Sequence, residues 1–275
     1  MYTLNCTGRL LVVDRPLVMG IMNLTPDSFY AGSRYTETEV LQQAERMIGE
    51  GASILDIGGQ STRPGSERVP VAVELERVTG AIQAIHARFP ETPVSIDTYY
   101  ARVAAEAVAA GASIVNDVSA GTVDAAMYET VGRLQVPYIL MHSKGTLDTL
   151  KKEFTYEHLN REVLDFFIRE TAACRQAGIK DIILDPGFGF GKNHVQNLSL
   201  LKQLSVFKLL DLPVLVGLSR KRTIWKTLDI TAEESLNGTT VINTISLANG
   251  AQILRVHDVR EAVQAVRLWQ AYQEA

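Results

Sequence analysis

Cysteine is scarce in this sequence, and long apolar runs are absent. Cys6 and Cys174 are the only cysteines among 275 residues, and they do not form the close pair that suits a metal. We therefore expect two free thiols and a reducing compartment. No apolar segment approaches the roughly 20 residues that a membrane helix needs, and the N-terminus has no signal-peptide pattern. These absences predict a cytoplasmic protein.

A surplus of one charge is also missing. The 27 basic and 31 acidic residues give a formal net charge of -4, without a long run of either sign. Nothing therefore indicates binding to nucleic acid or to a membrane surface, and a small-molecule partner is expected. Hydrophobic residues make up 46% of the chain, which is enough for a sizeable core. The length suits a single domain over residues 1–275, since one (β/α)8 barrel typically takes about 250 residues.

Eight short apolar runs, bounded by Gly, Pro or Asp, predict strands that are buried on both faces. They are Leu17–Met22, Ile54–Ile57, Val94–Ile96, Ile114–Val115, Tyr138–Met141, Ile182–Leu184, Val214–Val216 and Ile253–Val256. Longer segments with helical periodicity lie between them, for instance Val73–Arg88 and Tyr156–Ala177. A last helical segment carries Val259, Val263 and Val266 on one face.

This regular alternation places the chain in the α/β class. It permits a doubly wound sheet or a barrel, and eight consecutive strand–helix units in this length favour a single (β/α)8 TIM barrel. The leading segment Thr3–Val13 is interrupted by Gly8 and predicts a short β-hairpin that could close the bottom of the barrel. No linker, low-complexity tract or further repeat divides the chain.

Polar residues or glycine follow almost every predicted strand. They are Asn23, Gly58, Asp97, Asn116, His142, Asp185, Ser219 and Arg255. The strand C-termini of such a barrel share one face, so these residues are expected to converge there on one active site. The alternative for Asp97 and Asp117 is helix capping, because each precedes a helical segment.

The segment DPGFGFGK at 185–192 joins a strand-end carboxylate to a glycine-rich turn with aromatic side chains. Asp185 could accept two hydrogen bonds from an amidine-like edge such as N3 and the 2-amino group of a pterin, while an aromatic face stacks on the ring. Asn116 could add further contacts. The glycine spacing fits neither GxGxxG nor GxxxxGK[ST], which disfavours dinucleotides and nucleoside triphosphates.

Basic side chains lie at other predicted strand ends. Arg63, Arg220, Lys221, and Arg255 with His257 together could hold a pyrophosphate, although each alone is more often a solvated charge.

Metal ligands are few in the sequence. Asn23 could offer its amide oxygen to a hard cation that also binds phosphate. No His/Cys cluster suggests zinc, and a lone His142 more often packs or satisfies local hydrogen bonds than ligates a metal.

These residues stand in segments that resemble the dihydropteroate synthase family. The segment MGIMNLTPDSF at 19–29 is similar to its first-loop signature, and LDIGGQSTRPG at 55–65 to its second loop. The segments SIDT at 95–98, VNDVS at 115–119, DPGFGFGK at 185–192, GLSRK at 217–221 and RVHD at 255–258 continue the resemblance in family order. It spans roughly positions 17 to 260.

The resemblance implies a transferase of folate biosynthesis that condenses (7,8-dihydropterin-6-yl)methyl diphosphate with 4-aminobenzoate. Diphosphate leaves to give a stabilised pterin-methyl cation, and the arylamine then attacks. A homodimer, a pterin supplied by another polypeptide and a Mg²⁺ ion held by Asn23 are also implied. The implied catalytic residues are Asp97, Lys221 and Arg255. The implied contacts are Asp97, Asn116, Asp185, Phe190 and Lys221 for the pterin; Asn23, Arg63, Arg255 and His257 for the diphosphate; and Thr62, Arg63, Pro64, Phe190 and Ser219 for aminobenzoate.

Four positions depart from the family pattern. Gln60 replaces an acidic residue, Tyr100 a frequent lysine and Arg222 a small residue, and Ser143 lies in a changed segment after the fifth strand. Two stretches rich in Gly, Pro and Ser, at 23–34 and 58–68, are expected to act as lids.

Two competing functions remain. One is a pterin-dependent methyltransferase that delivers a methyl group to a corrinoid; the cationic set argues against it. The other is a non-catalytic, pterin-binding paralogue.

Overall fold

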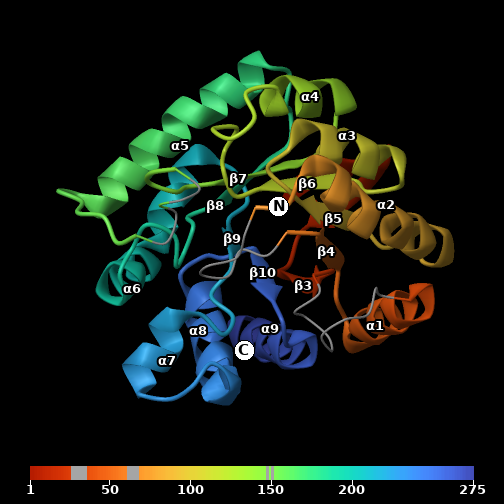
Figure 1. Ribbon diagram of the computed structural model, residues 1–275. Coiled ribbons are helices and arrows are strands. Elements are labelled where there is room, and N and C mark those ends of the chain that lie inside the picture. Colours follow the sequence, from red (N-terminus) through yellow and green to blue (C-terminus); the bar gives the residue numbers. More distant parts are fainter. Residues whose placement is uncertain (26–35, 61–67, 147–148, 150–151) are drawn as a thin grey trace.

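The computed structural model describes residues 1–25, 36–60, 68–146, 149 and 152–275. Its centre is a parallel sheet of eight strands in the order β8-β7-β6-β5-β4-β3-β10-β9, and a parallel bridge between Leu184 and Val214 brings its two edges together (Figure 1). The predicted (β/α)8 barrel is therefore confirmed. The strands are β3 (Leu17–Asn23), β4 (Ile54–Gly58), β5 (Val94–Asp97), β6 (Ile114–Asp117), β7 (Tyr138–Met141), β8 (Ile182–Asp185), β9 (Leu215–Val216) and β10 (Ile253–Val256).

Helices surround this barrel (Figure 1). Most of these helices turn buried residues towards the sheet, as α2 does with Val78, Ile82 and Ile85, whereas α7 packs against α6 and α8. The α-helices are α1 (Glu37–Glu50), α2 (Val71–Arg88), α3 (Ala101–Ala109), α4 (Met127–Leu134), α5 (Leu159–Gln176), α6 (His194–Lys202), α7 (Arg222–Leu228), α8 (Leu236–Ala248) and α9 (Val259–Glu274), with 3-10 helices η2 (Leu204–Leu210) and η3 (Glu233–Ser235). In the described part of the chain, no helix has the length and apolar character needed to cross a membrane.

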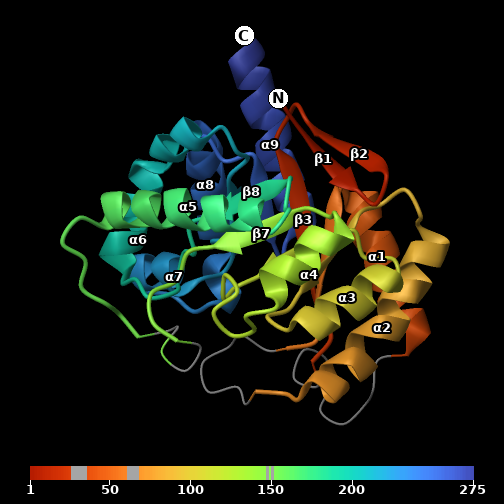
Figure 2. The ribbon, with the colours of Figure 1, turned by 90° about the horizontal axis from the view of Figure 1, so that it is seen from above.

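The N-terminal hairpin pairs β1 (Tyr2–Cys6) with β2 (Arg9–Val13) in antiparallel fashion, as predicted. Its two-residue turn, Thr7 and Gly8, has positive φ at both positions, the geometry that matches the twist of paired strands. The hairpin lies at the same end of the barrel as both chain termini (Figure 2). Its buried side chains form one apolar cluster with residues from the strands: Leu4, Cys6, Val13, Leu17, Met19, Ile54, Ile114, Ile139, Ile183, Leu215 and Ile253.

Successive side chains of a strand point to opposite faces of the sheet, so residues two apart share a face. Ile54 of β4 belongs to the apolar cluster beneath the hairpin, and Asp56 follows it on the same face. Ile253 and Arg255 have the same relation on β10. The barrel interior is therefore apolar at the N-terminal ends of the strands and charged towards their C-terminal ends.

Candidate functional site

A charged cluster joins four strands inside the barrel. The Nε of Arg255 donates to Oδ2 of Asp56 at 2.6 Å, and its Nη2 donates to Oδ2 of Asp97 at 2.6 Å. The Nδ2 of Asn116 donates to Asp56 Oδ2 at 3.2 Å. The structure thus brings together three predicted residues from β5, β6 and β10. It adds Asp56, which was not among the predicted site residues although it is a charged residue inside an apolar strand.

The cluster is almost closed to solvent. Burial, together with the carboxyls of Asp56, Glu74 and Asp117, raises the pKa of Asp97 to about 7 against the attraction of Arg255. Burial opposes the charge of Arg255, but the carboxylates of Asp56 and Asp97 outweigh it and raise the pKa of the guanidinium above its ordinary value. Buried charges are tolerated when they are paired and hydrogen-bonded, so these groups hold one another in fixed positions.

The glycine-rich turn after β8 forms the adjacent wall. Asp185 is 8% exposed, and its Oδ1 accepts the backbone N–H of Gly187 at 2.8 Å. Burial raises the pKa of its carboxyl, while Lys221 lowers it to a smaller extent. The Nζ of Lys221 donates to the carbonyl of Phe188 at 2.6 Å and lies 4.6 Å from the centre of the Phe190 ring. The carboxyl and the aromatic face predicted for this segment therefore lie together, and Lys221 from the loop after β9 adds a cation.

Only glycine fits at the start of this turn. Gly187 has a φ of +68°, and a Cβ there would lie within 1.9 Å of the carbonyl oxygen of His142. The ring of His142 is buried and packs edge-on against Phe166 with centroids 4.9 Å apart, which agrees with a packing role.

The loops after β9 and β10 touch through two predicted residues. The hydroxyl of Ser219 lies 3.1 Å from Nδ1 of His257, and the backbone N–H of His257 donates to the same oxygen at 3.2 Å. Arg220 was predicted to join the anion-binding cations, and in this structure it is paired with an acid instead. Its guanidinium makes two 2.8 Å hydrogen bonds to the carboxylate of Asp258, and its backbone φ is +55°.

The helix-capping alternative, which the sequence left open for Asp97 and Asp117, has a different outcome for each residue. Asp97 does not cap α3, whose first N–H is bound by Asp124 at 2.9 Å. Asp117 faces away from the barrel interior and accepts the N–H groups of Ser119 and Gly121 and the hydroxyl of Tyr138. Asp117 is therefore a structural group outside the charged cluster.

Asn23 ends β3 beside Gly58, and its Oδ1 would lie 3.6 Å from a Cβ built on that glycine. Within the described ranges, no group of three His, Cys, Asp or Glu side chains could hold a metal. A single amide oxygen suits a magnesium ion that takes most of its ligands from phosphate and water. Thr62, Arg63, Pro64 and most of the two predicted lids lie outside the described residues.

The residues that depart from the family pattern make contacts that are common in folded proteins. Oε1 of Gln60 accepts the N–H of Val69 at 3.0 Å, and the ring of Tyr100 packs on Tyr99 at 4.7 Å. Arg222 pairs with Glu153 at 2.9 Å, away from the charged cluster. Ser143 is partly buried after β7, and nothing in the structure explains its difference from the family pattern.

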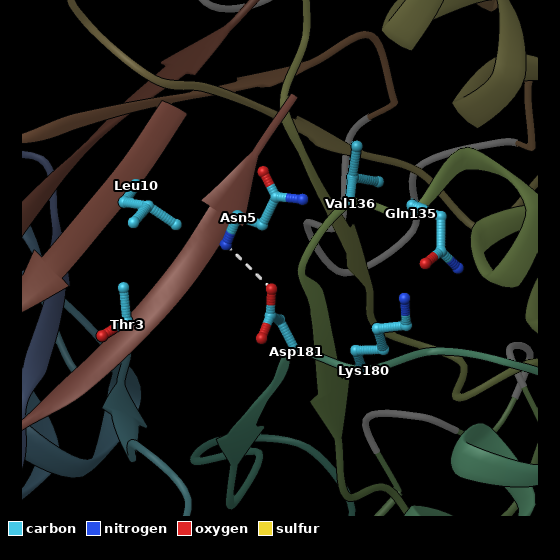
Figure 3. A pocket seen from close by; sticks show the side chains of 7 residues that line it. All are labelled: Thr3, Asn5, Leu10, Gln135, Val136, Lys180 and Asp181. Carbon is cyan, nitrogen blue, oxygen red and sulfur yellow. Dashed lines mark hydrogen bonds between the residues drawn. The ribbon is translucent and has the colours of Figure 1, made fainter. Parts of the chain in front are cut away.

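A pocket of about 250 Å³ lies at the opposite end of the barrel, between the hairpin and the segments that enter β7 and β8 (Figure 3). The backbone N–H of Asn5 donates a hydrogen bond to the carboxylate of Asp181 at 2.8 Å, drawn as a dashed line in Figure 3. None of the predicted site residues lines it. The lining residues are Thr3, Asn5, Leu10, Gln135, Val136, Lys180 and Asp181.

Several known proteins are similar to this chain in sequence and in fold. The family profile described as "Pterin binding enzyme" matches residues 19–257. Dihydropteroate synthase of Escherichia coli K12 is 42% identical over 96% of this chain and 94% of its own, and that of Bacillus subtilis is 40% identical over 94% and 89%. A Xanthomonas albilineans dihydropteroate synthase with 4-aminobenzoic acid superposes with a TM-score of 0.92 at 42% identity, covering 99% and 98% of the two chains. A structure of the enzyme from the same organism with 7,8-dihydropteroate gives 0.89 at 39% identity, covering both chains fully.

Proposed function

Because this chain belongs to the pterin-binding enzyme family, we propose that it condenses (7,8-dihydropterin-6-yl)methyl diphosphate with 4-aminobenzoate to give 7,8-dihydropteroate and diphosphate. It is a transferase of the dihydropteroate synthase type, acting in folate biosynthesis. The observation that carries the proposal is the meeting of the Asp185, Lys221 and Phe190 wall with the cluster around Arg255 at the C-terminal end of the barrel. Active sites of such barrels are built at this end.

The pterin would lie between these two groups. Asp185 offers a carboxylate to N3 and the 2-amino group, and Asn116 and Asp97 offer further polar atoms from β6 and β5. The Phe190 ring supplies an aromatic face, with the Lys221 ammonium above it. A flat, hydrogen-bonding heterocycle matches a site that combines one aromatic face with several buried polar groups.

Charge stabilisation is the chemistry that the reaction requires. As diphosphate leaves, negative charge grows on its oxygens, and fixed cations lower the barrier because they need no rearrangement. Arg255 is fixed by Asp56 and Asp97, and a guanidinium has five N–H donors, of which these bonds use only some. Asn23, Arg63 and His257 complete the proposed diphosphate site. The arylamine is neutral near pH 7, so its attack needs no strong base.

A magnesium ion is proposed to arrive with the diphosphate and to take one ligand from Asn23, where it would neutralise part of the leaving charge. Aminobenzoate is proposed to lie against Phe190 and Ser219, with Thr62, Arg63 and Pro64 from the second loop. The distance of 3.1 Å between Ser219 and His257 supports this arrangement, because it brings the loop after β9 next to the proposed diphosphate site.

A homodimer in the cytoplasm is also proposed. The outer surface of α8 exposes Val241 and Ile245 one turn apart, and Leu228 of the neighbouring α7 is likewise exposed. Exposed apolar side chains gathered on adjacent elements are typical of protein interfaces. The two free, buried thiols agree with a reducing compartment.

The test is diphosphate release by the purified protein with the pterin diphosphate and magnesium, in the presence and absence of 4-aminobenzoate. Aminobenzoate-dependent release together with 7,8-dihydropteroate formation would support the proposal. Pterin binding without turnover would favour a non-catalytic paralogue. Methyl transfer from a methylated tetrahydropterin to a corrinoid, without diphosphate release, would favour the methyltransferase.

A further inference from the structure

Lys192 ends the glycine-rich turn and points back into it. Its side chain is buried, with 5% of the residue exposed. Its Nζ donates to the carbonyl oxygens of Gly187 and Phe190, both at 3.1 Å, and to that of His142 at 3.4 Å. An ammonium group has three N–H donors and no acceptor, so three carbonyls satisfy it fully.

The same turn carries the wall of the proposed pterin site. The carbonyls of Gly187 and Phe190 face Lys192, whereas the carbonyl of Phe188, between them, accepts Nζ of Lys221 at 2.6 Å. The N–H of Gly187 donates to Asp185 at 2.8 Å. Lys192 therefore binds the buried side of the turn, and Lys221 binds the side that faces the proposed pterin site.

Lys192 does not itself reach a ligand. Its amine is enclosed by the turn and by the carbonyl of His142 at the end of β7, so it acts on the site only through the backbone that it binds. Burial lowers the pKa of Lys192 to about 7, the charge of Asp185 opposes this change, and Lys221 adds to it. Without Lys192, the carbonyl of Gly187 would keep the N–H of Phe190 at 3.1 Å, but the carbonyls of His142 and Phe190 would lose the ammonium donor, which favours a rearrangement of the turn.

We propose that Lys192 is a positioning residue of the synthase: its three hydrogen bonds fix the Phe190 ring and the Phe188 carbonyl, and through that carbonyl the ammonium of Lys221. The role rests on the proposed function. It differs from a purely structural role because its loss should weaken pterin binding in a protein that remains folded. Displacement of the Phe190 ring and the Lys221 ammonium, two groups proposed to hold the pterin, should act mainly on pterin affinity, because a preorganised site loses less on binding.

The experiment compares Lys192→Met, which keeps the aliphatic stem and removes the donors, with the wild-type protein. We expect the KM for the pterin diphosphate and the Kd of a 7,8-dihydropterin ligand to rise by about 10-fold or more, with a smaller change in kcat. Lys192→Arg retains charged donors and should recover part of the loss. Lys202→Met, at an exposed position of α6, is the matched control and should leave both constants unchanged.

Circular dichroism checks that each variant is folded. If Lys192→Met is unfolded, Lys192→Gln decides, because glutamine is shorter, uncharged and keeps fewer donors; a folded glutamine variant with the wild-type KM and Kd would overturn the positioning role. A folded Lys192→Met protein with wild-type KM and Kd would overturn it as well. Failure of the proposed function is distinguishable, because the wild type would then bind the pterin ligand without forming dihydropteroate, while the comparison of Kd values still tests Lys192.

Discussion

At the scale of single residues, Arg255 has the most demanding environment. Its guanidinium is bound at 2.6 Å by carboxylates from two other strands, so it is fixed before any substrate arrives. We expect Arg255→Ala to slow turnover by a factor on the order of 100 or more, comparable with the loss of one preorganised charge-stabilising donor. Steady-state measurement of dihydropteroate formation gives the rate.

A matched control exists at the opposite end of the barrel. Arg9 on β2 is exposed and pairs with Glu91 at 2.7 Å, far from the proposed chemistry. Arg9→Ala should leave kcat unchanged, since exposed ion pairs contribute little even to stability. Equal rates for the Arg255→Ala and wild-type proteins would remove Arg255 from the catalytic machinery.

Single residues also show which parts of the site could be predicted from the sequence. Strand-end polarity correctly selected Asp97, Asn116 and Arg255 as neighbours, because parallel strands end on one face. Asp56 was missed because it lies within a strand, two residues before its end. The alternation from Ile54 would have found it, since both share the inner face. The pairing of Arg220 with Asp258 could not be predicted, because it depends on a left-handed backbone conformation at Arg220, and no sequence pattern indicates that conformation.

At the scale of elements, α2 contains an unusual buried acid. Glu74 is fully buried, and neither of its carboxyl oxygens has a hydrogen-bond partner in the described structure. Burial raises its pKa to about 7, and the smaller effects of Thr98 and Arg77 lower it. The charge of Glu74 in turn raises the pKa of the Asp97 carboxyl and that of the Tyr99 hydroxyl. The acid is therefore neutral at low pH and costly to the fold when ionised.

The sign of the pH effect follows from linkage. The folded protein binds the Glu74 proton more tightly than the unfolded chain, so stability from this group is present below pH 4.5 and is lost as pH rises to about 7. Glu74→Gln, which cannot ionise, should raise the free energy of unfolding at pH 8 by up to about 3 kcal/mol and have little effect at pH 4.5. Urea unfolding at both pH values measures the difference.

The control for this prediction is Glu106→Gln, at an exposed position of α3, which should show no such pH dependence. A Glu74→Gln protein with the same stability change at both pH values would mean that Glu74 does not titrate within this window.

Element boundaries followed the sequence closely where periodicity was strong. The predicted strands Tyr138–Met141 and Ile253–Val256 are observed with the same bounds. Helix α5 begins three residues later than the predicted Tyr156, at Leu159. The cause is local: the carboxylate of Glu162 accepts the N–H groups of Glu157 and His158 and holds them outside the helix. Periodicity alone does not reveal such a contact.

At the scale of the whole molecule, the two ends of the barrel differ in polarity and in role. The hairpin seals one end with apolar side chains, and the polar strand ends form the proposed site at the other. The sequence predicted both features from order and polarity. It did not show which apolar residues remain exposed, because exposure depends on how adjacent helices pack.

The exposed apolar residues of α7 and α8 lead to the prediction about assembly. Val241 is 51% exposed, Ile245 40% and Leu228 52%, and the first two lie four residues apart on one helix face. In the proposed homodimer, a positive charge at each of the α8 positions would be buried without a partner, at a cost of several kcal/mol. The double variant Val241→Arg and Ile245→Arg should therefore have half the wild-type mass in light scattering at micromolar concentration.

Ile168→Arg is the matched control, because Ile168 on α5 is also 51% exposed but lies on another helix. This variant should keep the wild-type mass, since a single exposed apolar residue needs no partner. If the double variant on α8 keeps the dimeric mass, the two copies associate through another surface. If the wild type is itself monomeric, the homodimer is wrong, and the apolar surface of α7 and α8 needs a different explanation.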